Sequence, residues 1–118
     1  MGEERRSTQR VRAYRPVRLH RTGAGPVIET LSKDLSPDGL RCLSSLLFPV
    51  ATDLTVQLML STGDEPVTAR GRTVWFRTLP DSEQFEVGIS FTEIPPHQKR
   101  RLSAYLDRLA SHTDSVLA

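Results

Sequence analysis

The chain has 118 residues, a length that fits one compact domain with its own core and is too short for two. With 37% hydrophobic and 25% charged residues, the composition is that of a globular protein and excludes a disordered or fibrous one. The net charge is only +2. No stretch approaches the roughly 18–20 consecutive apolar residues that cross a bilayer, and the charged start of the chain, residues 1–6, predicts no secretory signal. A single cysteine, Cys42, excludes an internal disulfide and a multi-thiolate metal site. We therefore expect a cytoplasmic bacterial protein without membrane insertion and without a metal.

Positive charge gathers at the N-terminus. Residues 1–21 contain seven of the 14 arginines and only two acids, a net charge of +5, whereas the other 97 residues carry −3. Arginine outnumbers lysine by 14 to two, which favours planar, bidentate recognition of phosphates or guanine edges, although a GC-rich genome would give the same bias. Residues 1–13 have no apolar periodicity, so we expect a flexible arginine-rich arm that meets an anionic partner.

Six β-strands are predicted by the alternation of apolar and polar residues between clusters of Gly, Pro, Asp and Ser. In chain order they cover 17–20, 27–33, a third strand starting at Leu40, 54–60, 67–76 and 85–92. Cys42 alternates with its neighbours in the third strand, which indicates a small buried hydrophobic residue and not a nucleophile.

The pattern then changes to the helical period. Pro95 and Pro96 can open a helix, because proline at the first helical position loses no needed N–H. One apolar stripe follows at helical spacing, made of Leu102, Tyr105, Leu106 and Leu109. The predicted fold is mainly β: a six-stranded antiparallel barrel with a C-terminal helix over residues 14–111, preceded by the arm (1–13) and followed by a disordered tail (112–118).

Enzymatic motifs are missing from the sequence. The three histidines are scattered, and neither a metal-ligand spacing nor a complete glycine-rich phosphate loop occurs. We therefore expect a protein that is not an enzyme and that holds no cofactor.

Two motifs occur together instead. Arg6 and Arg10 form an RxxxR pattern, preceded by a further arginine, Arg5. Residues 34–39, with Asp34, Ser36 and Gly39, form a DxSxxG pattern in the turn between the second and third predicted strands. Each motif alone is weak evidence, since arginine pairs and Asp–Ser–Gly turns are common.

In this order, before a barrel and a closing helix, the motifs resemble those of the PilZ domain family, which binds the bacterial second messenger cyclic di-GMP. The resemblance covers roughly residues 4–110 and includes the strand 85–91 and the helix around 101–106. It implies a six-stranded barrel on which the RxxxR arm folds over a face that displays the DxSxxG turn.

The chemistry of the ligand agrees with this resemblance. Cyclic di-GMP carries two phosphates and two guanines, which Arg6 and Arg10 can clamp by bonding phosphates, guanine O6 and N7, or by stacking. The other guanine edge presents N–H donors, for which Asp34 can supply both carboxylate oxygens and Ser36 a hydroxyl. Gly39 fits either a positive φ in the turn or a close approach of ligand and backbone.

Two further residues are candidates for the site. In the family, the residue before RxxxR influences whether one ligand or an intercalated pair is bound, and an arginine at this place, Arg5, resembles the pair-binding kind. Trp75, the only tryptophan, either packs in or near the core or stacks on a base at the border of the site.

Ordering of the arm by the ligand would change the surface offered to another protein, so we expect signalling in trans to an unidentified effector protein. One alternative is a PilZ-like adaptor that acts by protein contacts without nucleotide. Another is a nucleic-acid-binding barrel, but its strands lack a platform of exposed aromatics, so we expect no nucleic acid polymer as partner. The protein could act as a monomer or as a homodimer.

Overall fold

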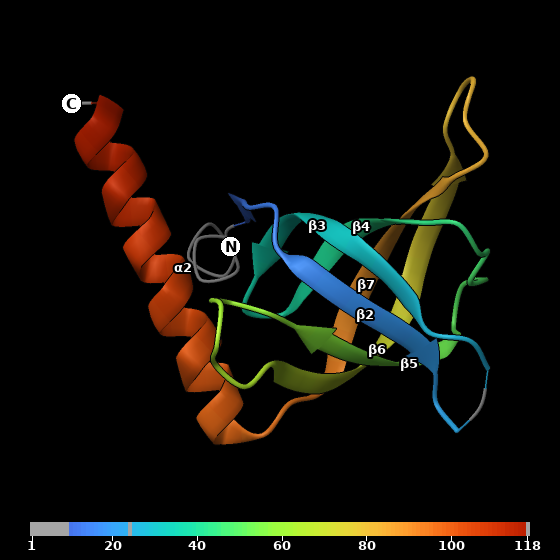
Figure 1. The fold of residues 1–118 in the computed structure, drawn as a ribbon, viewed down its shortest axis with the longest axis horizontal. Helices are drawn as coiled ribbons and strands as arrows, with labels where there is room; N and C mark the ends of the chain where they lie inside the picture. Colours follow the sequence, from blue (N-terminus) through green and yellow to red (C-terminus); the bar gives the residue numbers. More distant parts are fainter. Residues whose placement is uncertain (1–9, 24, 118) are drawn as a thin grey trace, which may run out of the picture.

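The computed structural model describes residues 10–23 and 25–117. Within them it contains seven strands and one helix (Figure 1). In chain order these are β1 (Val11–Arg12), β2 (Pro16–Arg21), β3 (Ile28–Ser36), β4 (Gly39–Ser44), β5 (Asp53–Leu58), β6 (Val67–Thr78), β7 (Phe85–Glu93) and α2 (Pro96–Leu117).

Six of the strands close into an antiparallel barrel. Around the barrel their order is β3-β2-β5-β6-β7-β4, and the pairing of β4 with β3 closes the ring. Closure is possible because β3 is long: its first half pairs with β2 and its second half with β4. The predicted six-stranded barrel with a C-terminal helix is thus confirmed.

The seventh strand, β1, lies in residues that the sequence analysis assigned to the flexible arm. Val11 pairs with Leu35 and Arg12 with Asp34, on the far side of β3 from β4. Val11 also packs against the core and Ala13 is buried, so two apolar side chains attach this short segment to the barrel. The sheet therefore begins at Val11 and not after residue 13.

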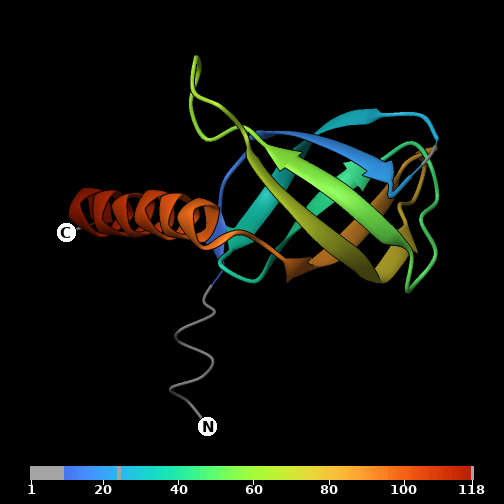
Figure 2. The same ribbon diagram turned by 90° about the horizontal axis from the view of Figure 1, so that it is seen from below.

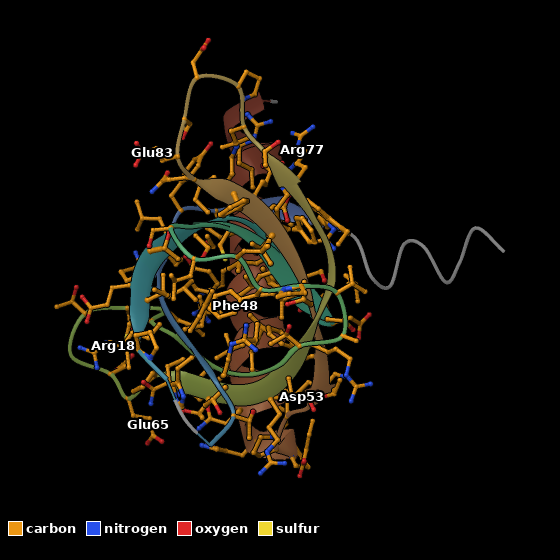
Figure 3. All side chains as sticks on the ribbon, turned by 90° about the vertical axis from the view of Figure 1, so that its right-hand side faces the viewer. Arg18, Phe48, Asp53, Glu65, Arg77 and Glu83 are labelled. Carbon is orange, nitrogen blue, oxygen red and sulfur yellow. The ribbon has the colours of Figure 1, made fainter. Side chains whose placement is uncertain are left out.

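The core fills the barrel with the inward side chains of the alternating strands, as their period of two predicts. Its fully buried members include Leu19, Leu35, Leu40, Leu54, Leu58 and Ile89. Phe48 is buried in the loop between β4 and β5 and lies near the middle of the barrel in the end-on view of Figure 3. Cys42 is also fully buried, and this burial raises the pKa of its thiol to about 12, as expected for a small hydrophobic residue in the core.

The helix α2 lies at one end of the barrel and then projects away from it (Figures 1 and 2). Its stripe contacts the barrel as predicted, with Leu102 and Leu106 buried and Tyr105 and Leu109 partly buried. It continues to Leu117, past residue 111, where the sequence analysis placed the end of the folded unit. No helix in the described ranges combines the length and apolarity needed to span a lipid bilayer.

Candidate functional site

The DxSxxG motif lies at a tight hairpin between β3 and β4. Asp34 and Ser36 belong to β3 itself, so only residues 37–38 form the turn, whereas the sequence analysis placed the whole motif in a turn. Pro37 stands at the first turn position, where its fixed negative φ fits a type I turn, and neither residue 37 nor residue 38 has a positive φ. The buried Ser36 hydroxyl accepts a hydrogen bond from the Asp38 N–H (3.2 Å) and donates one to the Gly39 carbonyl (3.4 Å). The motif therefore fixes the shape of its own hairpin.

Gly39 is required by a close contact and not by its φ, which lies outside the positive range. A Cβ on Gly39 would lie 2.1 Å from the carbonyl oxygen of Ile89 on β7. The sequence suggested a positive φ or a close approach of the ligand for this glycine. The structure shows no positive φ, and the close neighbour that it shows is the backbone of the next strand. Gly39 lets β4 and β7 pair at the end of the hairpin.

One row of paired residues crosses the outer face of the barrel. From β1 to β6 it contains Arg12, Asp34, Arg41, Gly88 and Trp75, each opposite the next in the sheet. Neighbouring strands lie about 4.8 Å apart, so this register brings the DxSxxG aspartate into one surface with residues from four other strands.

Asp34 is bound by two arginines, one on each carboxylate oxygen. Arg10 Nη1 donates to Asp34 Oδ1 at 2.8 Å, and Arg41 Nη2 lies 2.9 Å from Asp34 Oδ2. Arg10 is the second arginine of RxxxR, so the two motifs, 24 residues apart, meet in this ion pair. The Asp34 side chain is only 12% exposed, whereas that of Arg10 is 47% exposed.

A second carboxylate, Glu86 on β7, lies beside this pair and is completely buried. It contacts three cations: Arg77 Nε at 2.7 Å, Lys33 Nζ at 3.2 Å and Arg41 Nη1 at 3.6 Å. Burial by itself would raise the pKa of Glu86. The hydrogen bonds from Lys33 and Arg77 and the charge of Arg41 outweigh it, so the pKa lies below its ordinary value.

Trp75 lies on the outer face and outside the buried core. Its indole covers Gly88, where an added Cβ would lie 2.2 Å from the indole Nε1. A bulge in β6 just before Trp75 shifts the alternation, so that Trp75 and Arg77 both share the side of Gly88 and Glu86. Trp75 therefore packs against the outside of the barrel wall, near the core but not inside it.

We call this surface the basic face. It consists of Arg10, Lys33, Asp34, Arg41, Trp75, Arg77, Glu86 and Gly88. Its ion pairs involve four cations and two carboxylates, which leaves an excess of two positive charges. Such an excess on one surface attracts anions.

The structure brings together three of the residues that the sequence selected, Arg10, Asp34 and Trp75, with Ser36 and Gly39 in the adjoining hairpin. Arg5 and Arg6 lie outside the described residues. In the described ranges no cluster of three or more His, Cys, Asp or Glu is arranged to hold a metal.

Sequence reasoning missed Arg41, Glu86, Lys33, Arg77 and Gly88 as members of this surface. The alternation did place Glu86 and Gly88 on the outward side of their strand. An outward glycine in a strand next to an otherwise apolar run was a usable signal, because such a glycine marks the close approach of another group. The register between strands, which joins these residues, cannot be read from the alternation alone.

The model of one protein family, the PilZ domain, matches residues 4–108. With a closed antiparallel barrel, a C-terminal helix and a match over most of its length, the chain belongs to the PilZ domain family. PilZ domains are generally receptors without catalytic activity. A search of curated protein sequences gave no match.

Solved structures show the same fold at low sequence identity. The PilZ domain of YcgR from Escherichia coli, solved with c-di-GMP, is 13% identical with a TM-score of 0.70, over 96% of this chain and 97% of that one. The Bacillus subtilis inhibitor of motility MotI/DgrA is 21% identical with a TM-score of 0.74, and this chain spans 88% of its own length and half of that protein. The Borreliella burgdorferi PlzA protein, in complex with c-di-GMP, is 20% identical with a TM-score of 0.55, over 89% of this chain and 37% of that one.

Proposed function

We propose that this chain is a receptor for cyclic di-GMP and that the ligand binds on the basic face. The observation that carries the proposal is the 2.8 Å ion pair between Arg10 of RxxxR and Asp34 of DxSxxG. Family membership and the c-di-GMP complexes of structurally similar PilZ proteins support it. The excess of two positive charges on the basic face favours the negatively charged phosphates of the ligand.

Each part of the ligand has a matching group. Asp34 accepts hydrogen bonds from N1–H and the 2-amino group of one guanine, since each carboxylate oxygen has capacity beyond its arginine. Arg10 turns from Asp34 to the phosphates or to guanine O6 and N7, together with Arg6. Trp75 offers its half-buried indole for stacking on a base.

Arg5, the residue before RxxxR, sets how many ligands bind to one chain. Arg5 stacks on or bonds a second guanine, so that an intercalated pair of ligands binds. Binding draws residues 1–9 onto the barrel, and this new surface passes the signal to a partner protein in the bacterial cytoplasm.

The single tryptophan makes the proposal directly testable. Titration of the protein with cyclic di-GMP should change Trp75 fluorescence in a saturable way, and cyclic di-AMP should not, because adenine presents an acceptor at N1 where Asp34 needs a donor. Arg10→Ala should raise Kd at least tenfold, since a charge-assisted hydrogen bond contributes about 1.5–3 kcal/mol.

Arg18→Ala is the matched control. Arg18 forms an exposed ion pair with Glu29 on the β2–β3 side and lies on the other side of the barrel from Arg77 in Figure 3. This variant should bind as the unmodified protein does. The proposal is wrong if neither fluorescence nor calorimetry detects saturable cyclic di-GMP binding, or if both dinucleotides bind equally well.

A further inference from the structure

The two arginines that hold Asp34 are anchored differently. Arg10 precedes the two-residue strand β1 and reaches Asp34 with a side chain that is 47% exposed. Arg41 is directly opposite Asp34 in the β3–β4 hairpin, and its guanidinium contacts two carboxylates, those of Asp34 and Glu86. When Arg10 leaves Asp34 for the nucleotide, Asp34 therefore still has one fixed cation, Arg41.

Glu86 is what fixes Arg41. Its carboxylate is fully buried, and a buried charge is stable only while it stays paired. Lys33 and Arg77 hold the same carboxylate from β3 and β6, so Glu86 is bound from three strands besides its own. Arg41 lies between this network and Asp34, with Nη1 toward one carboxylate and Nη2 toward the other.

We propose that Arg41, held by Glu86, is a positioning residue that keeps the Asp34 carboxylate oriented for a guanine edge after Arg10 has turned to the nucleotide. Arg41 belongs to neither sequence motif. The inference rests on the proposed function, because it assigns Asp34 the role of guanine acceptor. A carboxylate held at one oxygen by a fixed guanidinium keeps its plane, and a fixed plane is what two parallel N–H donors require.

The consequence is selectivity as well as affinity. Hypoxanthine keeps the N1–H of guanine but lacks the 2-amino group, so it uses one carboxylate oxygen where guanine uses two. A correctly oriented Asp34 therefore prefers cyclic di-GMP to cyclic di-IMP, and a loosely held Asp34 loses this preference. A residue that merely stabilises the fold, or that binds phosphate, would change both affinities by the same factor.

Calorimetric titrations with both dinucleotides test the inference on Arg41→Gln and Glu86→Gln, with Arg18→Gln as the control. We expect Arg41→Gln and Glu86→Gln each to bind cyclic di-GMP about tenfold more weakly or worse. The ratio of the Kd for cyclic di-IMP to the Kd for cyclic di-GMP should be smaller in both variants than in the unmodified protein. Arg18→Gln should keep both affinities. Circular dichroism verifies that each variant is folded.

Four outcomes overturn the inference. If folded Arg41→Gln has the same Kd values as the unmodified protein, or if its Kd values for both dinucleotides rise by the same factor, Arg41 does not position Asp34. The proposed function stands in both cases. If Arg41→Gln does not fold, Arg41→Lys takes its place. Lysine lacks the planar fork that points one nitrogen at each carboxylate, so an unchanged ratio contradicts the inference. If the unmodified protein binds no cyclic di-GMP, both proposals are wrong.

Discussion

At the scale of single residues, Asp34 is the residue that joins the parts of the site. It is a nearly buried carboxylate with one arginine on each oxygen, and it is the point where the N-terminal motif meets the hairpin motif. Two arginines on a carboxylate offset the cost of its burial and also hold its orientation. Asp34 is thus both a structural contact and the acceptor that a guanine edge needs.

Asp34→Asn should separate these roles, because it keeps the shape and removes the charge. The amide keeps one acceptor oxygen, but its NH2 group is a donor. It would face the N–H of either an arginine or a guanine, and two donors form no hydrogen bond. We expect the variant to fold and to bind cyclic di-GMP at least tenfold more weakly in calorimetry. Asp53→Asn, at an exposed ion pair with Arg72, is the control and should bind normally. Equal binding by both variants would remove Asp34 from the site.

At the scale of elements, the site depends on how β3, β4, β6 and β7 pair. Gly39→Ala tests this pairing, since its Cβ would meet the Ile89 carbonyl oxygen at 2.1 Å and backbone cannot move aside without separating β4 from β7. We expect the free energy of unfolding to fall by about 1–3 kcal/mol, as for overpacking elsewhere. Urea unfolding followed by Trp75 fluorescence measures it. Unchanged stability would show that the two strands do not approach as closely as described.

The network around Glu86 also belongs to this scale, because it joins four strands. The pKa of Glu86 is lower in the folded protein than its ordinary value of about 4.5. The ionised carboxylate therefore stabilises the fold above pH 4.5, and this contribution is lost as the pH falls through the folded pKa. Glu86→Gln should be less stable than the unmodified protein at pH 7, and the difference should shrink below pH 4.5. Urea unfolding at pH 7 and pH 3.5 measures both. A difference that does not depend on pH would contradict the role of the charge.

The elements were largely predictable from the sequence, and their pairing was not. Strict alternation in 54–58 and 85–91 located β5 and β7, and the spacing of Leu102, Leu106 and Leu109 located α2, because one face of each is buried. β1 escaped prediction since two residues give no period. Arg41 and Glu86 were not predicted as site residues. They join the site through the register between strands, which includes a bulge in β3 and another in β6.

At the scale of the whole molecule, the barrel presents the basic face on its outside, and Arg10 joins this face from just before β1. Arg10 is the last residue before β1, and it already touches Asp34. Of the two RxxxR arginines, Arg10 is therefore the one whose contact with the DxSxxG motif the structure describes. The C-terminal end of α2 projects away from the barrel (Figure 2).

Isothermal titration calorimetry of cyclic di-GMP with the unmodified protein and with Arg6→Ala/Arg10→Ala tests the central claim most directly. We predict micromolar or tighter binding with close to two ligands per chain, and loss of the binding heat in the double variant. Binding of one ligand per chain would contradict the role given to Arg5. No heat with the unmodified, folded protein would contradict the claim that this chain is a cyclic di-GMP receptor. Equal binding by the double variant would contradict the claim that the RxxxR arginines form its site.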